Sequence, residues 1–384
     1  MNNNICLLTA SEQAARIAKI APECPTLVAD NANIFYLTGR VFAGYILLEP
    51  DKAPRYFVKR PTVLTGDGII PIRKPEEIAA HLDALPSRLG LELATLSYAE
   101  VLRLLKALGN PEPVDAGSRI MAARAVKTPV EIEMLRRDGI RQAAVYRKIP
   151  GLYRPGMTDI ELQAAIEYAS RLAGCLGVFR VNGRSMEIHM GSVLTGENSD
   201  APSPYDFAMG GAGLDPSLPV GASGEEIAHG GAVMVDMNGC FNGYMTDCTR
   251  MYSNGTLPPE AVKAYDCSLE ICRTLARDGK PGTEAKALYE TARSIAAARG
   301  LEDYFMGHRR HAAFVGHGVG IEVNELPVLA PRSKAVLTEG NVIAIEPKFV
   351  LPGFGAIGLE NTYVCTPSGL ECLTPAPEEI ISLI

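Results

Sequence analysis

Several features that mark particular classes of protein are absent from this sequence of 384 residues. Lys and Arg number 37 against 44 Asp and Glu, so the net charge is −7 and the chain has no basic surplus for binding nucleic acid. No apolar run approaches the roughly 18 residues of a membrane span. The stretch from Met1 to Leu7 lacks the basic start and apolar core of a secretory signal. We therefore expect a cytoplasmic protein that binds neither nucleic acid nor a membrane.

Three common catalytic or binding motifs are also missing. The nine cysteines are scattered and are never spaced C-x-x-C, which argues against a disulfide framework and a thiolate zinc site. No G-x-S-x-G elbow for a serine nucleophile occurs. The glycine cluster Gly210–Gly213 has no strand pattern before it and no helical pattern after it, so it does not predict a phosphate-binding loop.

The composition is that of a globular protein, with 47% hydrophobic and 21% charged residues. A chain of this length exceeds the roughly 250–300 residues at which a single core stops growing, so we expect two domains. In the first third, strand patterns at 44–49 and 55–59 alternate with helical patterns at 74–85 and 98–108, which predicts a small α/β domain.

Long helices replace this pattern near residue 125. Thr128 and Glu131 form a capping-box pattern with Pro129 at the first helical position, and Thr158 and Glu161 repeat the box at the next helix. We therefore place the boundary between residues 120 and 128, with domains at 1–125 and 126–384. Strand patterns dominate from about residue 176, interrupted by helical stretches at 259–278 and 284–298. The stretch 198–224, rich in Pro, Gly, Ser and Asp, predicts a long loop with a functional role.

Two aspartates lie where a hairpin would bring them together. Asp236 ends the apolar run that begins at Gly231, and burying an unpaired carboxylate there would cost several kcal/mol. Asp247 follows eleven residues later, with the turn-like segment 239–243 between them. Two adjacent carboxylates repel each other, so either one is protonated or a cation lies between them.

Three further residues extend this pattern. Glu346 closes the apolar run 342–345, Glu360 follows the apolar run 356–359, and His317 lies between two glycines. Taken singly, an acidic residue at a strand end is usually a turn residue or exposed, and a lone His is usually structural. Together, four carboxylates and one imidazole suit two divalent ions such as Mn²⁺, Co²⁺, Zn²⁺ or Fe²⁺, roughly 3.5–4 Å apart with a bridging water.

These residues and their flanks resemble the ordered metal-ligand signature of the pita-bread-fold metallopeptidases, the M24 family of creatinase, prolidase and Xaa-Pro aminopeptidase. The resemblance rests on Asp236-x₁₀-Asp247, Gly316-His317-Gly318, Ile345-Glu346-Pro347 and Leu359-Glu360-Asn361. It extends over nearly the whole chain, because 33–39 resembles the creatinase-type N-terminal domain and 127–132 the helix that follows it. The implied fold is a creatinase-type α/β domain followed by an α+β pita-bread catalytic domain.

The resemblance implies roles for all five residues. Asp247 and Glu360 would bridge the two ions, Asp236 would bind one ion, and His317 and Glu346 would bind the other. A water between the ions would be the nucleophile, and Glu346 would also act as the general base. The implied substrate is a short peptide, and the larger family members are commonly homodimers.

The sequence departs from the family around this centre. Asn324 stands where peptide-cleaving members carry a second His, and Ala313 replaces a further His four residues before His317. The loop containing Pro204 and Tyr205 lacks a third His, and Gly358 replaces an Arg. We expect Asn324 and His311 to act on the substrate with Glu346. Other candidates to replace the missing histidines are Tyr205, Asp206, His189, His229, Arg309 and Arg310.

Three functions remain open at this point. The first is a metallopeptidase that cleaves short peptides before proline, as an Xaa-Pro aminopeptidase or dipeptidase. The second is a member of the same fold that acts on a small molecule as a C–N hydrolase or a lyase, which the missing histidines favour. The third is a non-catalytic protein that binds a peptide or a partner, which the retention of all five donors opposes.

Overall fold

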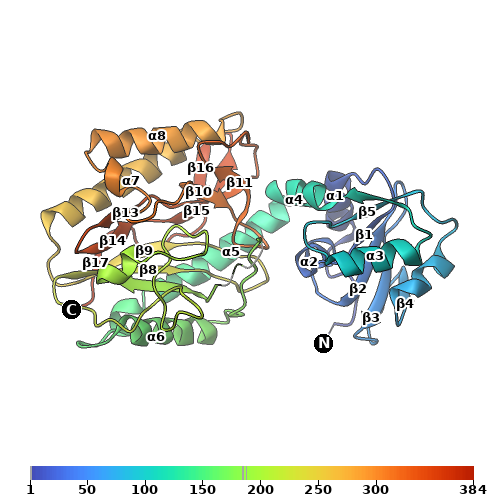
Figure 1. Cartoon of the computed structure of the whole chain (residues 1–384), viewed down its shortest axis with the longest axis horizontal. Helices are drawn as coiled ribbons and strands as arrows, with labels where there is room; N and C mark the ends of the chain where they lie inside the picture. Colours follow the sequence, from blue (N-terminus) through green and yellow to red (C-terminus); the bar gives the residue numbers. More distant parts are fainter. Residues whose placement is uncertain (1, 184–185, 187) are drawn as a thin grey trace. The chain divides into compact units, whose positions relative to one another are not determined.

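The computed structural model describes residues 2–183, 186 and 188–384. The chain forms two compact units, Met1–Arg124 and Ala125–Ile384, and each has its own sheet structure (Figure 1). Both units mix helices and strands, as the sequence predicts. No helix among the described residues is long and apolar enough to span a membrane.

The first unit is built on one sheet with strand order β4-β3-β2-β1-β5-β6. Its strands are β1 (Thr26–Val28), β2 (Ala43–Leu48), β3 (Arg55–Arg60), β4 (Ile69–Pro71), β5 (Arg88–Leu91) and β6 (Glu112–Asp115). Its helices are α1 (Ala10–Ile20), α2 (Asn31–Thr38), α3 (Tyr98–Ala107) and α4 (Gly117–Ala125). Leu27, Phe57 and Leu89 from the sheet pack with Leu104 of α3 in a buried core, which explains the apolar periodicity of these segments.

One predicted helix of this unit is shorter than expected. The pattern at 74–85 gives a 3-10 helix at Pro75–His81, and Leu82 is already extended. The hydrogen-bond geometry of a 3-10 helix is poorer than that of an α-helix, and such helices seldom run beyond a few residues. The segment accordingly ends after about two turns.

In the second unit, both predicted capping boxes are confirmed. Thr128 accepts from the backbone of Glu131 at the start of α5 (Pro129–Tyr146), and Thr158 accepts from that of Glu161 at the start of α6 (Asp159–Leu172). The two later helical stretches form α7 (Pro259–Asp278) and α8 (Ala285–Ala298). In Figure 1, α7 and α8 lie on one side of the strands of this unit and α6 on the other.

The strands of the second unit form three sheets. Their orders are β17-β9-β8-β7, β11-β10-β12-β15-β16 and β13-β14. Their bounds are β7 (Gly191–Thr195), β8 (Gly231–Met237), β9 (Thr249–Asn254), β10 (Gly316–Gly318), β11 (Glu325–Leu329), β12 (Val342–Ile345), β13 (Lys348–Leu351), β14 (Gly355–Gly358), β15 (Asn361–Thr366), β16 (Gly369–Cys372) and β17 (Ile381–Ser382). Buried Met234, Ile343 and Phe349 of these strands share a core with Ala264 and Ile271 of α7.

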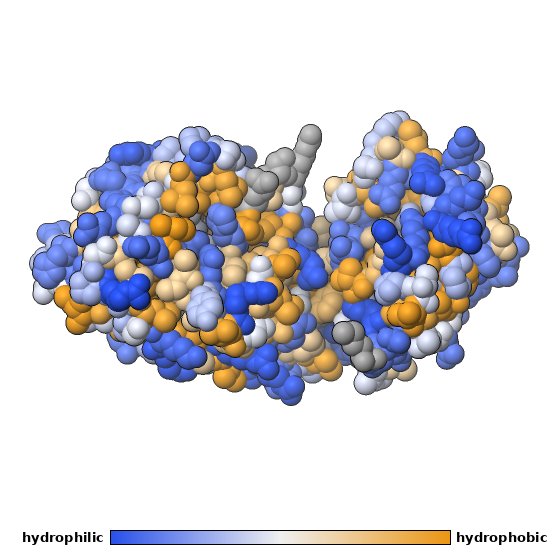
Figure 2. All heavy atoms as spheres, turned by 90° about the horizontal axis from the view of Figure 1, so that it is seen from below, coloured by the Kyte–Doolittle hydropathy of each residue, from blue (hydrophilic) through white to orange (hydrophobic). Residues whose placement is uncertain are grey.

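The predicted long loop is largely present. A 3-10 helix at Gly196–Asp200 takes up its first residues, and 201–224 contains no helix or strand. On the face of the molecule in Figure 2, hydrophobic and hydrophilic residues are interspersed in both units. Single exposed apolar side chains of this kind are ordinary on a globular surface.

Candidate metal centre

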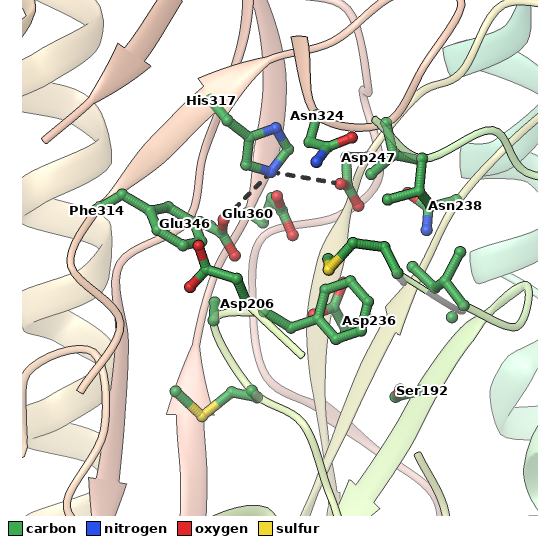
Figure 3. A pocket seen from close by; sticks show the side chains of 18 of the residues that line it. Ser192, Asp206, Asp236, Asn238, Asp247, Phe314, His317, Asn324, Glu346 and Glu360 are labelled. Atoms are coloured by element: carbon green, nitrogen blue, oxygen red, sulfur yellow. Dashed lines mark ion pairs between the residues drawn. The ribbon is translucent and has the colours of Figure 1, made fainter. Parts of the chain in front are cut away.

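The five residues that the sequence selects all line one cavity of about 160 Å³ in the second unit (Figure 3). They come from different strands or from the residues beside them. Asp236 is on β8, Asp247 precedes β9, His317 is on β10, Glu346 follows β12 and Glu360 precedes β15. Strand pairing explains how residues more than one hundred positions apart in the chain meet at one place.

The predicted hairpin between the two aspartates is present. β8 pairs with β9 in antiparallel register, with Asp236 opposite Thr249, and a further bridge joins Gly239 to Thr246. The turn at its tip therefore lies at 240–245. This register brings Asp236 and Asp247 to the same end of the hairpin.

His317 reaches the centre through the neighbouring sheet. Its strand pairs with β12, with Gly316 opposite Ile345, so that Glu346 follows directly. Nδ1 of His317 lies 3.1 Å from the carbonyl oxygen of Gly318, which can only accept a hydrogen bond. In the neutral ring, the proton is therefore held on Nδ1 and the Nε2 lone pair faces the cavity. Nε2 lies 3.3 Å from Oε1 of Glu346 and 3.8 Å from Oδ2 of Asp247.

The two central carboxylates are held by neighbouring polar groups. The backbone N–H of Asp247 donates to Oγ1 of Thr362 at 2.9 Å, and that hydroxyl donates back to the Asp247 carbonyl at 2.8 Å. With its amide nitrogen turned toward Asp247, Asn238 donates to the carboxylate at 2.9 and 3.2 Å. Thr249 donates to Oε2 of Glu360 at 2.7 Å. Such contacts orient a ligand before it binds a metal.

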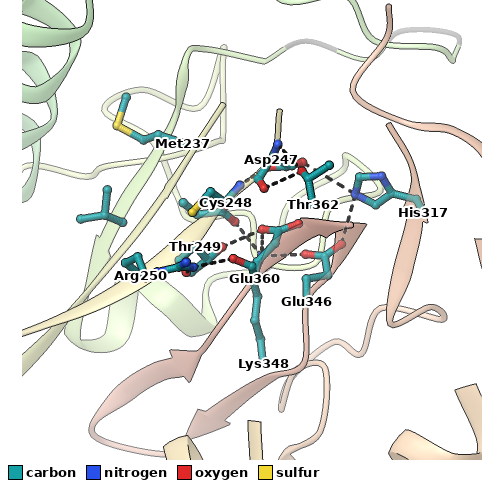
Figure 4. A network of polar contacts seen from close by, with 12 residues as sticks. Met237, Asp247, Cys248, Thr249, Arg250, His317, Glu346, Lys348, Glu360 and Thr362 are labelled. Carbon is teal, nitrogen blue, oxygen red and sulfur yellow. Dashed lines mark hydrogen bonds and ion pairs between the residues drawn. The ribbon is translucent and has the colours of Figure 1, made fainter. Parts of the chain in front are cut away.

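Arg250 fixes the backbone behind the centre (Figure 4). Its guanidinium is fully buried and donates to the carbonyl oxygen of Glu360 at 2.6 Å and to that of Thr249 at 2.8 Å. It also donates to Oδ1 of Asn361 at 2.6 Å and to carbonyl oxygens of the segment 374–377. One side chain therefore joins β9, β15 and the C-terminal segment around Glu360.

Lys348 is a residue of the centre that the sequence analysis did not select. Its side chain is 1% exposed, and Nζ donates to Oδ2 of Asp236 at 2.7 Å, to Oε2 of Glu346 at 2.6 Å and to Oε2 of Glu360 at 3.5 Å. Figure 4 shows it extending from β13 toward Glu346 and Glu360. The sequence does contain evidence for this position. Residues two apart on an extended chain share a face, and Lys348 follows Glu346 at that spacing.

In the metal-free centre, protonation of Asp247 and Glu360 reduces the negative charge. Burial raises the pKa of Asp247 to about 7, and the charge of Asp236 adds to this effect. Burial, followed by the charge of Asp247, also raises the pKa of Glu360 well above its usual value. A cation between these groups would replace the proton that they retain.

The other groups of the centre shift in the sense expected for ion pairs. Burial alone would lower the pKa of His317, but the hydrogen bond with Glu346 and the nearby carboxylate charges raise it to about 9. Burial alone would raise the pKa of Glu346, but the charges of Lys348 and His317 lower it to about 2. For Lys348, the charges of the surrounding carboxylates outweigh burial and raise the pKa. Glu346 is therefore ionised at neutral pH.

The donor set fits a divalent metal ion. Asp247, His317 and Glu360 each offer an atom, and these atoms lie within 4.8 Å of one another. Within the described chain, Oε1 of Glu360 is buried and has no hydrogen-bond partner, which is costly unless a cation binds it. Asp236, Glu346 and Glu360 form a second such group. That group could hold another ion only if Lys348 moved away from the carboxylates.

Asn324 lines the cavity, and its amide is already engaged. Nδ2 donates to the carbonyl oxygen of Asn182 at 2.6 Å, and Oδ1 accepts from the N–H of Asn182 at 2.7 Å. The side chain thus holds the segment that carries Val181, another residue of the cavity wall. The role of Asn324 toward a substrate stays a prediction, and the structure shows that its amide also holds the backbone of Asn182.

The structure does not bring His311 to the cavity. Its side chain is exposed, and Nδ1 lies 2.9 Å from the carbonyl oxygen of Phe305. Of the other candidates, Asp206 lines the cavity among the described residues. Arg309 pairs with Glu197 and Asp200, and Arg310 donates to the carbonyl oxygen of Tyr205 at 3.1 Å, so both anchor the long loop. His189, His229 and Tyr205 are not among the described residues of this cavity.

The rest of the cavity wall is largely apolar. The long loop supplies Phe207, Met209 and Val220, and the segments beside His317 supply Phe314 and Val323. A volume of about 160 Å³ exceeds what a metal ion and one water molecule need. The cavity therefore has room for part of a substrate with an apolar side chain.

Comparison with known families identifies this arrangement. Residues 133–367 match the model of metallopeptidase family M24. The chain belongs to this family. Residues 26–126 match the creatinase/prolidase N-terminal domain, so both parts of the predicted fold are confirmed. Membership of the M24 family makes the chain a metallopeptidase and implies divalent metal ions at its centre.

The similarity to M24 relatives extends over nearly the whole chain. The Xaa-Pro dipeptidase of Pyrococcus horikoshii is 28% identical over 363 residues, which cover 92% of this chain and 93% of that protein. The crystal structure of a prolidase from the same organism superposes with a TM-score of 0.79 at 24% identity, covering 97% and 100% of the two chains. The Xaa-Pro dipeptidase from Bacillus anthracis has a TM-score of 0.81 at 24% identity, with the same coverage. These structures share the fold of this chain.

Proposed function

We propose that this M24 metallopeptidase hydrolyses the peptide bond that precedes proline in short peptides. The observation that carries the proposal is the donor group Asp247, His317 and Glu360, which lies beside a largely apolar cavity. Several relatives, including that of Pyrococcus horikoshii, are Xaa-Pro dipeptidases. The substrate is thus an Xaa-Pro dipeptide or a longer peptide with proline in second position.

The metal is proposed to be Mn²⁺, Co²⁺, Zn²⁺ or Fe²⁺, since carboxylate and imidazole donors together suit ions of intermediate hardness. When bound, such an ion lowers the pKa of a water molecule and polarises the scissile carbonyl. His317 would hold it through Nε2, and Asp247 and Glu360 through carboxylate oxygens. Oε1 of Glu360, which lacks a partner among the described residues, is a ready donor.

Glu346 is the proposed general base. Its pKa is held at about 2, so the carboxylate is ionised at neutral pH, and as a weak base it would accept a proton from a water molecule made more acidic by the bound ion. Its Oε1 faces Nε2 of His317 at 3.3 Å, and both residues line the cavity. The proton it accepts would then pass to the leaving nitrogen.

The cavity wall would position the peptide. Phe207, Met209 and Phe314 provide apolar contacts for a proline ring, which presents no N–H group to be satisfied. Asp206 contributes a carboxylate to the same wall and would pair with the free amino group of the peptide. Binding and bond cleavage would thus take place in the same cavity.

Peptide hydrolysis by the full chain tests this function. Xaa-Pro dipeptides and Xaa-Pro-Yaa peptides would be assayed with added Mn²⁺, together with Glu346→Gln and a control, Glu260→Gln, on the exposed side of α7. We expect proline-dependent cleavage that Glu346→Gln reduces by at least about 10²-fold and Glu260→Gln leaves unchanged. A metal-loaded protein that cleaves none of these peptides would contradict the proposal.

A second function is favoured by Asn324. The family's peptide-cleaving members carry a His at this position, whereas here the amide holds the backbone of Asn182. If every peptide fails although metal is bound, the centre would serve a small molecule as a C–N hydrolase or a lyase. Two further predictions remain from the sequence, a homodimer and a cytoplasmic location. Sedimentation equilibrium and cell fractionation would test them.

A further inference from the structure

We propose that the ammonium group of Lys348 permanently takes the place of one of the two metal ions, so that this chain binds a single divalent ion. The inference concerns the number of ions and rests on the proposed metal binding, not on the peptide substrate. In this arrangement, Asp236 is a partner of Lys348 and not a metal ligand.

The position of the ammonium group is the first argument. Nζ of Lys348 lies 2.7 Å from Asp236, 2.6 Å from Glu346 and 3.5 Å from Glu360. These are the same three residues that form the second possible metal group. A cation already occupies the point at which their oxygen atoms converge.

The carboxylates are divided between the two cations, which is the second argument. Glu346 turns Oε2 to Lys348 and Oε1 to Nε2 of His317. Glu360 turns Oε2 to Lys348 and Thr249, whereas its Oε1 has no partner among the described residues. Each glutamate therefore keeps one oxygen on the side away from Lys348, available for an ion with Asp247 and His317.

The surroundings of Lys348 are the third argument. Its side chain is 1% exposed, so it cannot release the carboxylates and turn into water without moving strand β13. The chain makes room for its stem at Gly358, where a Cβ atom would lie 2.7 Å from Cγ of Lys348. The position is therefore built for this side chain.

Charge balance gives the fourth argument. Four carboxylates surround the centre, those of Asp236, Asp247, Glu346 and Glu360. The ammonium group and one divalent ion nearly neutralise them. A second divalent ion would also have to share three of these carboxylates with the ammonium group, and the repulsion between two neighbouring cations in a buried space is costly.

The number of ions per chain tests the inference directly. Full-length protein would be loaded with Mn²⁺, freed of unbound ions by gel filtration and analysed for metal content. We expect one ion per chain in the wild type and two in Lys348→Met, which keeps the length of the side chain and removes its charge. Two ions in the wild type, or one ion in folded Lys348→Met, would overturn the inference.

Lys127→Met is the matched control. Lys127 is also 1% exposed and pairs with one buried carboxylate, that of Glu325, at 3.0 Å. Its replacement disturbs a buried ion pair in the same unit, and we expect one ion per chain as in the wild type. A second ion in this variant would mean that the gain does not depend on Lys348, and would also overturn the inference.

Asp236→Asn provides a test that does not require Lys348→Met to fold. The amide oxygen of Asn can still accept from Lys348, so we expect one Mn²⁺ per chain with nearly unchanged affinity. If Asp236 is instead a metal ligand, affinity should fall at least about tenfold or the ion should be lost, which would overturn the inference. Both readouts use Mn²⁺ without a peptide, so a failure to cleave peptides leaves this result unaffected.

Discussion

Lys348 and Gly358 lie opposite each other in the β13–β14 pair, and the glycine leaves the space through which the lysine stem reaches the carboxylates. The ammonium group of Lys348 contacts Asp236 and Glu346 within 2.7 Å. The hairpin thus supplies a fixed positive charge to the metal centre.

Filling the space at Gly358 should therefore disturb the centre. In Gly358→Ala, the new Cβ atom would lie 2.7 Å from Cγ of Lys348 and 2.8 Å from the carbonyl oxygen of Pro347. We expect a loss of about 1–3 kcal/mol in the free energy of unfolding, measured by urea denaturation. Gly151→Ala is the control, because nothing lies within 4 Å of its Cβ position. Equal stability of the two variants would contradict this account of Gly358.

The second prediction concerns Arg250. Arg250→Lys cannot reproduce the planar set of donors that reaches Glu360, Asn361 and the segment 374–377. Several buried carbonyl groups would lose their partner at about 1–3 kcal/mol each, so we expect a loss of at least about 3 kcal/mol and weaker Mn²⁺ binding.

Arg293→Lys is the control for Arg250. Arg293 forms an exposed pair with Glu302, and such pairs contribute about 0–1 kcal/mol. Thermal unfolding of both variants, with and without Mn²⁺, separates the two positions. A change in Arg250→Lys no larger than in Arg293→Lys would show that Arg250 does not hold the centre together.

The third prediction concerns the pH dependence of the metal-free protein. Burial raises the pKa of Asp247 from 3.8 to about 7, so between these values the folded protein retains a proton that the unfolded chain has lost. The free energy of unfolding should therefore fall as the pH rises through this range. His317, with its pKa raised from 6.5 to about 9, continues the fall over that interval.

Metal binding should have the opposite pH dependence. Binding of the ion requires an ionised Asp247 and a neutral His317, so it displaces a proton from each, and Mn²⁺ affinity should rise by up to about 100-fold per pH unit below neutrality. Mn²⁺ titrations in this range and melting curves without metal give the two slopes. In metal-free Asp247→Asn, the stability should decline less over the acidic range. An unchanged decline would contradict the assignment to Asp247.

The fourth prediction concerns Asn324→His. The imidazole restores a group that can carry a proton beside the substrate, so we expect kcat/KM for a peptide substrate to rise. The two hydrogen bonds with the backbone of Asn182 would be lost, at a cost of about 1–3 kcal/mol in stability. No change or a fall in activity, with the fold intact, would indicate a site arranged for a different reaction.

The residues of the centre differ in how far the sequence predicts them. Asp236 and Glu346 interrupt or close apolar strands, which is visible locally because a buried carboxylate needs a partner. Lys348 could have been predicted in the same way, because its spacing of two residues from Glu346 places both side chains on one face of an extended chain. Lys348 was nevertheless not predicted, because acidic residues and histidines are the usual metal ligands and a buried lysine is not one of them.

Contacts between distant segments could not be predicted in this way. The side-chain amide of Asn324 forms hydrogen bonds with the backbone of Asn182, which lies 142 positions earlier in the chain. His311 is close to His317 in sequence, yet the turn at 307–311 leaves its side chain exposed. In the fold, both capping boxes and the β8–β9 hairpin follow from local patterns. The short 3-10 helix at Pro75–His81 shows that apolar periodicity alone does not fix the helix type.

The most direct test of the account is equilibrium dialysis of the metal-free chain against Mn²⁺, compared with Asp247→Asn and His317→Ala. We expect stoichiometric binding by the wild type and its loss in both variants, because these residues meet with Glu360 around one ion position. A wild-type chain that retains no divalent ion after incubation with Mn²⁺ or Co²⁺, or variants that bind as the wild type does, would contradict it.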